Sequence, residues 1–201
     1  MAEPAYALPE NQEAWPTQGA WTWEDYLRLP DDGRRYEIIE GVLYVAAAPT
    51  FAHQFSVSKL HLVMGSFVEE RRLGLVLVAP FDVRLPGVAN PVEPDLLFLS
   101  AGSEPKAGDT HFAGVPDLIV EVLSPGSKRL DQHVKFGAYE KAGVPEYWLV
   151  DPKARSIAVF SFDAEKRLYE EEGTFGVGEK VRSIVLEGFE TPVAPLFPPQ
   201  F

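Results

Sequence analysis

The sequence contains no cysteine among its 201 residues. A disulfide framework and a thiolate metal site are therefore excluded, and any bound metal would need oxygen or imidazole ligands, which favours hard cations. Apolar runs are short, and none approaches the roughly 20 residues that a membrane-spanning helix requires. The N-terminal stretch MAEPAYALPENQ has neither the basic start nor the apolar segment of a secretory signal, so we expect a cytoplasmic protein with no membrane partner.

Basic residues are scarce, because 18 Lys and Arg stand against 30 Asp and Glu and give a net charge of −12. This charge repels polyanions at long range and argues against a tight, non-specific grip on nucleic acid, although it permits a local basic groove. With 46% hydrophobic and 24% charged residues, the composition is globular. The length suits a single domain with a substantial core, predicted over 21–201, after an N-terminal arm over 1–20 that carries three prolines and no period.

Three elements are predicted in the first third of the chain. Thr22 is a candidate N-cap for a short helix over WEDYLRL. The segment RYEIIEGVLYVAA predicts a hairpin that turns at residues 40–41. Apolar residues at helical spacing then predict a long helix from His53 to about Leu73, with Gly74 supplying its end.

Four later runs rich in Val, Leu and Phe are typical of buried strands, and we expect them to form one sheet. They cover residues 75–85, 94–100, 116–124 and 146–152. The segment between the last two has a helical apolar face and ends at Gly143, so a strand–helix–strand crossover is predicted. The remaining chain predicts a strand at 156–162, a polar hairpin around 167–185 and a proline-broken tail at 189–201. The expected fold is α/β, a mixed central β-sheet flanked by helices.

Glu121 interrupts the apolar run PDLIVEVLSP. An unpaired ionised side chain that is taken out of water costs several kcal/mol or more, so this carboxylate needs a cation, a hydrogen-bonding partner or a raised pKa. Side chains alternate along a strand, which puts Glu121 on the face of Ile119 and Leu123. Asp95 opens the preceding strand, and if the two strands are neighbours, both carboxylates can share a divalent cation such as Mg²⁺.

Pro94-Asp95 followed by Glu121, within the order helix, three strands, helix, strand, resembles the PD-(D/E)XK nuclease superfamily. The motifs RRYEIIEG (34–41), APFDVRL (79–85), VEPDLLFLS (92–100) and the segment 115–152 resemble the Uma-two family of restriction-endonuclease-like proteins over about residues 20–190. The resemblance implies a restriction-endonuclease-like core and Mg²⁺- or Mn²⁺-dependent hydrolysis of DNA phosphodiester bonds. It also implies that Asp95 and Glu121 hold the metal.

The superfamily has a lysine two residues after the Glu, where this chain has Leu123. Lys135 is the best replacement, because it lies on the following helix in a polar stripe with Asp131 and Tyr139 at spacings of four. Lysines moved to this helix occur in the superfamily. The stripe is also similar to the Gln-x-x-x-Tyr helix of some recombination-type nucleases. Glu37 is a candidate third acid and metal ligand, because it lies in an otherwise apolar strand.

Each candidate also has a structural interpretation. Glu121 can be salt-bridged to Lys135, Asp95 can cap the turn after Pro94, and Glu37 can form an ion pair within its hairpin. Asp131 and Lys135 can form an ordinary surface pair.

Two residues outside this set are also open to interpretation. His53 can touch substrate or can face solvent or cap its helix, and Asp82 is kept outside the site as an outer ligand or a partner of Arg84.

Three functions therefore remain open on the sequence. The first is a metal-dependent endonuclease with DNA as its partner, active as a homodimer. The second is a non-catalytic binding or assembly protein that kept the nuclease core, favoured by Leu123 and by the acidity of the chain. The third is a metal-dependent hydrolase of a small phosphate ester, since two acids do not specify the size of a substrate.

Overall fold

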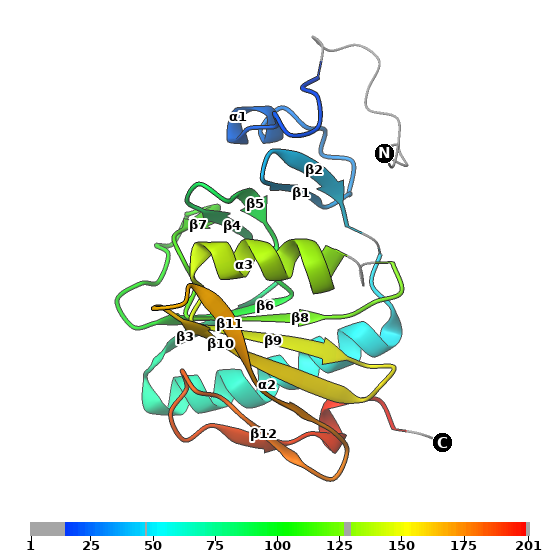
Figure 1. Cartoon of the computed structure of the whole chain (residues 1–201), viewed down its shortest axis with the longest axis vertical. Coiled ribbons are helices and arrows are strands. Elements are labelled where there is room, and N and C mark those ends of the chain that lie inside the picture. Colours follow the sequence, from blue (N-terminus) through cyan, green and yellow to red (C-terminus); the bar gives the residue numbers. More distant parts are fainter. Residues whose placement is uncertain (1–14, 47, 127–129, 200–201) are drawn as a thin grey trace.

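The computed structural model describes residues 15–46, 48–126 and 130–199, so most of the predicted arm lies outside the described residues. Figure 1 shows a large sheet with α3 above it and α2 below it, and a smaller sheet beyond α3. The large sheet has the order β11 (Leu168–Phe175), β10 (Ser156–Asp163), β9 (Glu146–Asp151), β8 (Leu118–Val122), β6 (Leu96–Ser100), β3 (Gly74–Val78). The smaller sheet has the order β2 (Val42–Val45), β1 (Tyr36–Ile39), β5 (Ala89–Val92), β4 (Asp82–Leu85), β7 (His111–Ala113). The prediction of mixed β-structure flanked by helices is confirmed.

The early elements form where the sequence predicts them. Thr22 caps α1 (Trp23–Tyr26) in a reciprocal capping box with Asp25, and the helix ends well before Pro30. The hairpin of β1 and β2 pairs Tyr36 with Val45 and turns at residues 40–41, whose φ angles of 51° and 72° are those of a tight left-handed turn. Glu37 lies on β1, the first strand of this hairpin, and the residues of that strand are all buried.

The long helix α2 (Phe51–Arg71) begins at Thr50, whose hydroxyl accepts a hydrogen bond from the backbone N–H of His53 at 3.2 Å. Its end differs from the prediction, because Arg72 rather than Gly74 takes the left-handed conformation. Gly74 instead opens β3 with φ 141°, and a Cβ there would lie 2.0 Å from the backbone oxygen of Leu99. The glycine is required by close strand packing, not by the helix end.

The predicted strand over 75–85 is divided between the two sheets. Its first half forms β3 at the edge of the large sheet, and its second half forms β4 in the small one. Pro80 lies between them and has no backbone N–H to donate to a ladder, so the pairing of β3 cannot continue past it. The expectation that the four runs share a sheet holds for β3, β6, β8 and β9.

The predicted crossover is present. Strands β8 and β9 are parallel, with Leu118 opposite Glu146, and they are joined by the π-helix η1 (Leu130–Lys135) and α3 (Phe136–Ala142). The first turn of the predicted helix, residues 127–129, lies outside the described residues. Since η1 is a π-helix, the residues of the predicted polar stripe follow a wider turn than an α-helix would give them.

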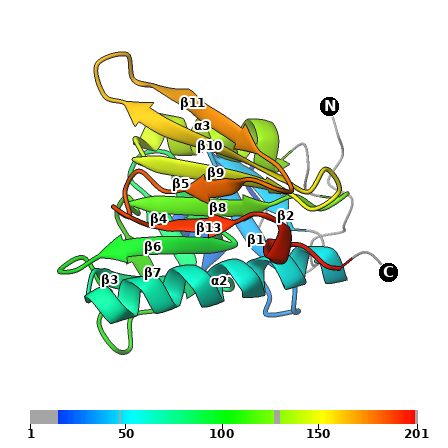
Figure 2. The same ribbon diagram turned by 90° about the horizontal axis from the view of Figure 1, so that it is seen from below.

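The C-terminal third pairs differently from the prediction. The segment 168–175 extends the large sheet by pairing with β10, and β12 (Lys180–Arg182) pairs with β13 (Glu190–Pro192). The proline-containing tail includes the 3-10 helix η2 (Ala194–Leu196), which packs against α2, as Figure 2 shows from below. Phe189 and Phe197 are buried there because the lower face of the sheet is wider than α2 alone can cover.

Two apolar clusters occupy the two faces of the large sheet. Leu118, Val120 and Val122 face α2 and the C-terminal elements, whereas Ile119 faces α3 and the small sheet. The predicted alternation is therefore confirmed, and Glu121 points toward the α3 side. Within the described residues, no helix combines the length and the apolar character that a membrane crossing needs.

Candidate active site

The two acids predicted to share a metal lie across from each other on neighbouring strands. The antiparallel register of β6 and β8 pairs Leu96 with Val120, so Asp95, one residue before β6, stands opposite Glu121. Both side chains are buried, with exposures of 7% and 1%. The Asp95 Oδ2 atom accepts a hydrogen bond from the backbone N–H of Val122 at 2.9 Å, which ties the first acid to the strand of the second.

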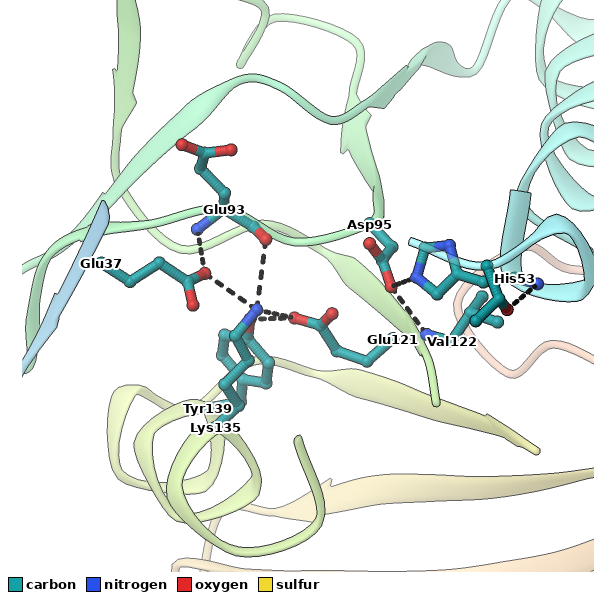
Figure 3. Close-up of polar contacts among 9 residues, drawn as sticks. Glu37, His53, Glu93, Asp95, Glu121, Val122, Lys135 and Tyr139 are labelled. Carbon is teal, nitrogen blue, oxygen red and sulfur yellow. Dashed lines mark hydrogen bonds and ion pairs between the residues drawn. The ribbon is translucent and has the colours of Figure 1, made fainter. Parts of the chain in front are cut away.

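Lys135 is the centre of this group. Its Nζ atom lies 2.8 Å from Glu37 Oε1 and 3.0 Å from Glu121 Oε1, and it donates a hydrogen bond to the backbone oxygen of Glu93 at 3.2 Å. Figure 3 shows these contacts converging on the lysine ammonium. The alternative in which Glu121 is salt-bridged to Lys135 is therefore confirmed for this contact. The lysine brings together the large sheet, the small sheet and the crossover.

Tyr139 lies four residues after Lys135 and reaches the same acid. Its hydroxyl donates a hydrogen bond to Glu121 Oε1 at 2.5 Å. Burial, together with the charges of Glu121 and Glu37, raises the pKa of this phenol well above its ordinary value, so it remains a neutral donor. Two residues of the predicted polar stripe, Lys135 and Tyr139, therefore lie in the site. The side chain of the third, Asp131, lies outside the described part of the chain.

Glu37 enters the site from the small sheet. Its Oε1 atom accepts hydrogen bonds from the backbone N–H of Glu93 at 2.8 Å and pairs with Lys135. Its Oε2 atom is buried and has no hydrogen-bond partner among the described residues. The prediction of an ion pair within the hairpin is wrong, because the partner lies 98 positions along the chain on η1.

His53 was not included in the predicted site, yet its Nε2 atom lies 2.9 Å from Asp95 Oδ2 and its side chain is buried. The capping role belongs to Thr50. Burial alone would raise the pKa of Asp95, but the hydrogen bond and charge of His53, the charge of Lys135 and the N–H of Val122 together lower it. Asp95 is therefore a carboxylate at neutral pH. The sequence signal was only the position of His53 at the start of the helix.

Glu93 is the second residue missed. Its side chain is 7% exposed, and its Oε2 atom has no hydrogen-bond partner among the described residues. Burial, with the charges of Glu37 and Asp82, raises its pKa to about 7, against the opposing charges of Arg35 and Lys135. Its place two residues before Asp95, on the same face of an extended segment, was the available signal.

Asp82 has a different partner from the one considered. It accepts hydrogen bonds from the Tyr26 hydroxyl at 2.9 and 3.1 Å, and burial raises its pKa. Arg84 instead lies over the ring of Trp23 and donates to the Asn90 side chain, so the proposed pairing of Arg84 with Asp82 is wrong.

The site residues line one small cavity of about 40 Å³. The acids at its wall are Glu37, Glu93, Asp95 and Glu121, joined by His53, Lys135 and Ser124. In the described part of the chain, no three acids or histidines already converge in the arrangement of a metal cluster.

The donor set nevertheless fits a hard cation. All the acids offer oxygen ligands, two buried carboxylate oxygens lack partners among the described residues, and the space exceeds the roughly 10–15 Å³ that one water molecule needs.

A mixed sheet that carries an aspartate and a glutamate on adjacent strands, with a lysine beside them, defines a fold of the restriction-endonuclease-like type. The comparisons with known proteins agree. Residues 23–194 match the family model described as "Uma2: Putative restriction endonuclease", and the chain belongs to this family. Membership supports a nuclease-like function.

A solved structure has the same fold. It is described as a putative nuclease belonging to DUF820 from Anabaena variabilis ATCC 29413, and it is similar to this chain with a TM-score of 0.73 and 20% sequence identity. The match covers 88% of this chain and 97% of that one. No curated protein matches the chain.

Proposed function

We propose that this protein hydrolyses phosphodiester bonds in DNA with Mg²⁺ or Mn²⁺ held by Asp95 and Glu121, and with Glu37 as a third acid. The observation that carries the proposal is the buried ammonium of Lys135, which contacts Glu37 and Glu121 at the wall of the cavity that Asp95 also lines. A purely structural ion pair needs one acid, whereas this lysine faces two, with two further acids beside it. An excess of buried acid over base is the condition that a divalent cation relieves.

Each acid has a defined place in this proposal. Asp95 Oδ2 is occupied by Val122 and His53, which leaves Oδ1 as the oxygen that would face a cation. Glu121 Oε1 is occupied by Lys135 and Tyr139. When bound, the metal would supply Lewis-acid polarisation of a phosphate oxygen and a more acidic water.

Side chains of the protein itself orient the acids and offset their negative charge. His53 and Tyr139 each hold one acid in a single orientation, so the ligands are placed before a metal arrives. The Lys135 ammonium offsets the charge of two carboxylates, and its positive charge can stabilise negative charge that develops on a nearby phosphate.

The absence of a lysine at position 123 fits this arrangement. Leu123 is buried, and its backbone N–H donates to the oxygen of Val150 at 2.8 Å. Lys135 instead brings an ammonium to Glu121 from the crossover helix, which supports a role for a lysine beside this glutamate without the E-x-K spacing.

The non-catalytic alternative also has an observation in its favour. Glu121 is held by both Lys135 and Tyr139, and a core that only needed to neutralise this acid would look similar. The two views differ in their metal requirement. A hydrolase loses activity when the acids are neutralised, whereas a binding protein keeps its affinity for its partner.

The experiment is a nuclease assay on supercoiled and linear DNA with Mg²⁺, Mn²⁺ or EDTA. We expect metal-dependent cleavage by the wild type, and a loss of at least about 100-fold for Glu121→Gln and Lys135→Met. Lys141→Met is the matched control, because Lys141 lies on α3 but is exposed and pairs with Glu40. Cleavage that survives in Glu121→Gln, or a wild type with no metal-dependent activity, would contradict the proposal.

A homodimer and a cytoplasmic location remain predictions. A surface suited to pairing two copies is the edge strand β3, whose sequence GLVLV is uncharged and partly exposed, whereas the opposite edge β11 carries three consecutive glutamates. Charged edge strands resist pairing with another chain and uncharged ones favour it. Light scattering on the wild type and on a Val76→Lys variant tests this assignment.

A further inference from the structure

A second cavity adjoins the candidate active site. It has a volume of about 160 Å³ and lies between the start of α2, the end of the hairpin and the segment after β3. Four residues line both cavities, namely Arg35, Pro49, His53 and Asp95. The second cavity is called the Arg35 pocket below. Because the same side chains form the wall between the two spaces, a ligand in one lies directly beside a ligand in the other.

Arg35 is held in place by the hairpin. Its backbone oxygen accepts a hydrogen bond from Ala46 at 2.9 Å, which continues the ladder of β1 and β2 by one step. Since side chains alternate along extended backbone, Arg35 lies on the same face as Glu37, and its neighbour Arg34 lies on the other. The Arg34 side chain is 40% exposed and pairs with Asp32, so the two adjacent arginines have separate environments.

The charge of Arg35 is available to an anion. No carboxylate within the described ranges lies at ion-pair distance from its guanidinium, whereas Lys135 is already paired with both Glu37 and Glu121. The charge of Arg35 acts to lower the pKa of Glu93, which lines the neighbouring cavity. Arg35 is therefore the side chain at the junction that can bind a phosphate bidentately without giving up a salt bridge.

Other polar groups line the same space. The Gln54 side chain is at the wall, and α2, a helix of 21 residues with no acid in its first turn, begins beside it. The first N–H groups of such a helix carry a partial positive charge that favours anions. His53 is buried, lines the pocket, and has an Nδ1 atom with no hydrogen-bond partner in the described residues.

We propose that the Arg35 pocket binds the phosphodiester group next to the one that is cleaved, with the Arg35 guanidinium as its main contact. The inference rests on the proposed function and narrows its substrate class. An enzyme for a small phosphate ester needs one phosphate site, whereas adjoining sites for two phosphates fit a polynucleotide strand. The pocket also supplies a local attraction for DNA in a chain whose net charge of −12 repels it.

The test measures binding of a fluorescein-labelled 20-base-pair DNA by anisotropy, with Ca²⁺ in place of Mg²⁺, at a series of salt concentrations. The variants are Arg35→Gln and Arg35→Lys, and Arg34→Gln is the control. We expect Arg35→Gln to bind about 10-fold more weakly and to reduce the salt slope by about one, the signature of one lost phosphate contact. Arg35→Lys should keep the salt slope and bind DNA about threefold more weakly, because a lysine cannot bind a phosphate bidentately. Arg34→Gln should match the wild type.

Each outcome decides the inference. Equal affinity and slope for Arg35→Gln and the wild type would overturn it and leave the proposed hydrolysis standing. Binding that depends on Arg35 without any cleavage would support the pocket while the hydrolytic proposal fails. A wild type that does not bind DNA would overturn both. If Arg35→Gln does not fold, Arg35→Lys decides, and wild-type affinity for that variant would count against the bidentate contact.

Discussion

Replacing Lys135 with methionine tests whether one ammonium compensates the buried acids. Methionine keeps the length and apolar stem of lysine but removes the charge from between Glu37 and Glu121. These three side chains are 6%, 1% and 1% exposed, so bulk solvent screens the two remaining charges only weakly. Removal of one partner from a buried ion pair typically costs about 3–5 kcal/mol, because the remaining charge is left without compensation. We expect a loss of that size in the free energy of unfolding at pH 7.

The assay is urea unfolding followed by circular dichroism, with and without Mg²⁺. The loss should shrink when Mg²⁺ is added if the acids bind the metal. The double variant Lys135→Met with Glu121→Gln should regain part of the loss, which a double-mutant cycle measures. A loss below about 1 kcal/mol for Lys135→Met would refute the view that the lysine balances the acids, since ordinary surface substitutions stay within that range.

Three further predictions concern neighbouring groups. The pKa of Glu93 is raised to about 7, so the folded state binds its proton more tightly, and this contribution to stability is present below the unfolded pKa and lost as the pH rises through 7. Glu93→Gln should therefore remove a decline of about 3 kcal/mol in unfolding free energy between pH 4.5 and pH 7, and an unchanged profile would contradict the assignment. The pKa of Asp95 is lowered, so its contribution is present above the unfolded value and lost as the pH falls through the folded one. The stability advantage of the wild type over Asp95→Asn should begin to fall below about pH 4 and disappear below the folded pKa. Tyr139→Phe should cost about 1–2 kcal/mol through the lost hydrogen bond to Glu121, measured by thermal unfolding, and a neutral effect would show that the bond contributes nothing.

The sequence predicts those parts of the site that depend on local periodicity. A period of two puts Glu121 on the α3 face, and the register of β6 and β8 brings Asp95 opposite it. A spacing of four places Lys135 and Tyr139 on one side of the crossover, and both reach Glu121. These placements follow from backbone geometry alone, which is why single-sequence reasoning finds them.

Contacts between distant segments are harder to predict. His53 meets Asp95 across 42 positions, and nothing in the composition of the first helical turn distinguishes a buried histidine from an exposed one. Glu37 reaches Lys135 only because the small sheet packs above α3, and the sequence does not encode that packing in any local pattern. The division of residues 75–85 was missed for the same reason, since an apolar run reads alike whether it belongs to one sheet or to two.

The acids and the lysine come from parts of the chain that are made at very different times. Glu37 is synthesised early and Lys135 almost 100 residues later, and the ammonium reaches both carboxylates only after the crossover has folded back between the sheets. A nascent or truncated polypeptide that stops before the crossover carries the acids without their cation. The buried acids are therefore balanced only once the crossover has been made and has folded.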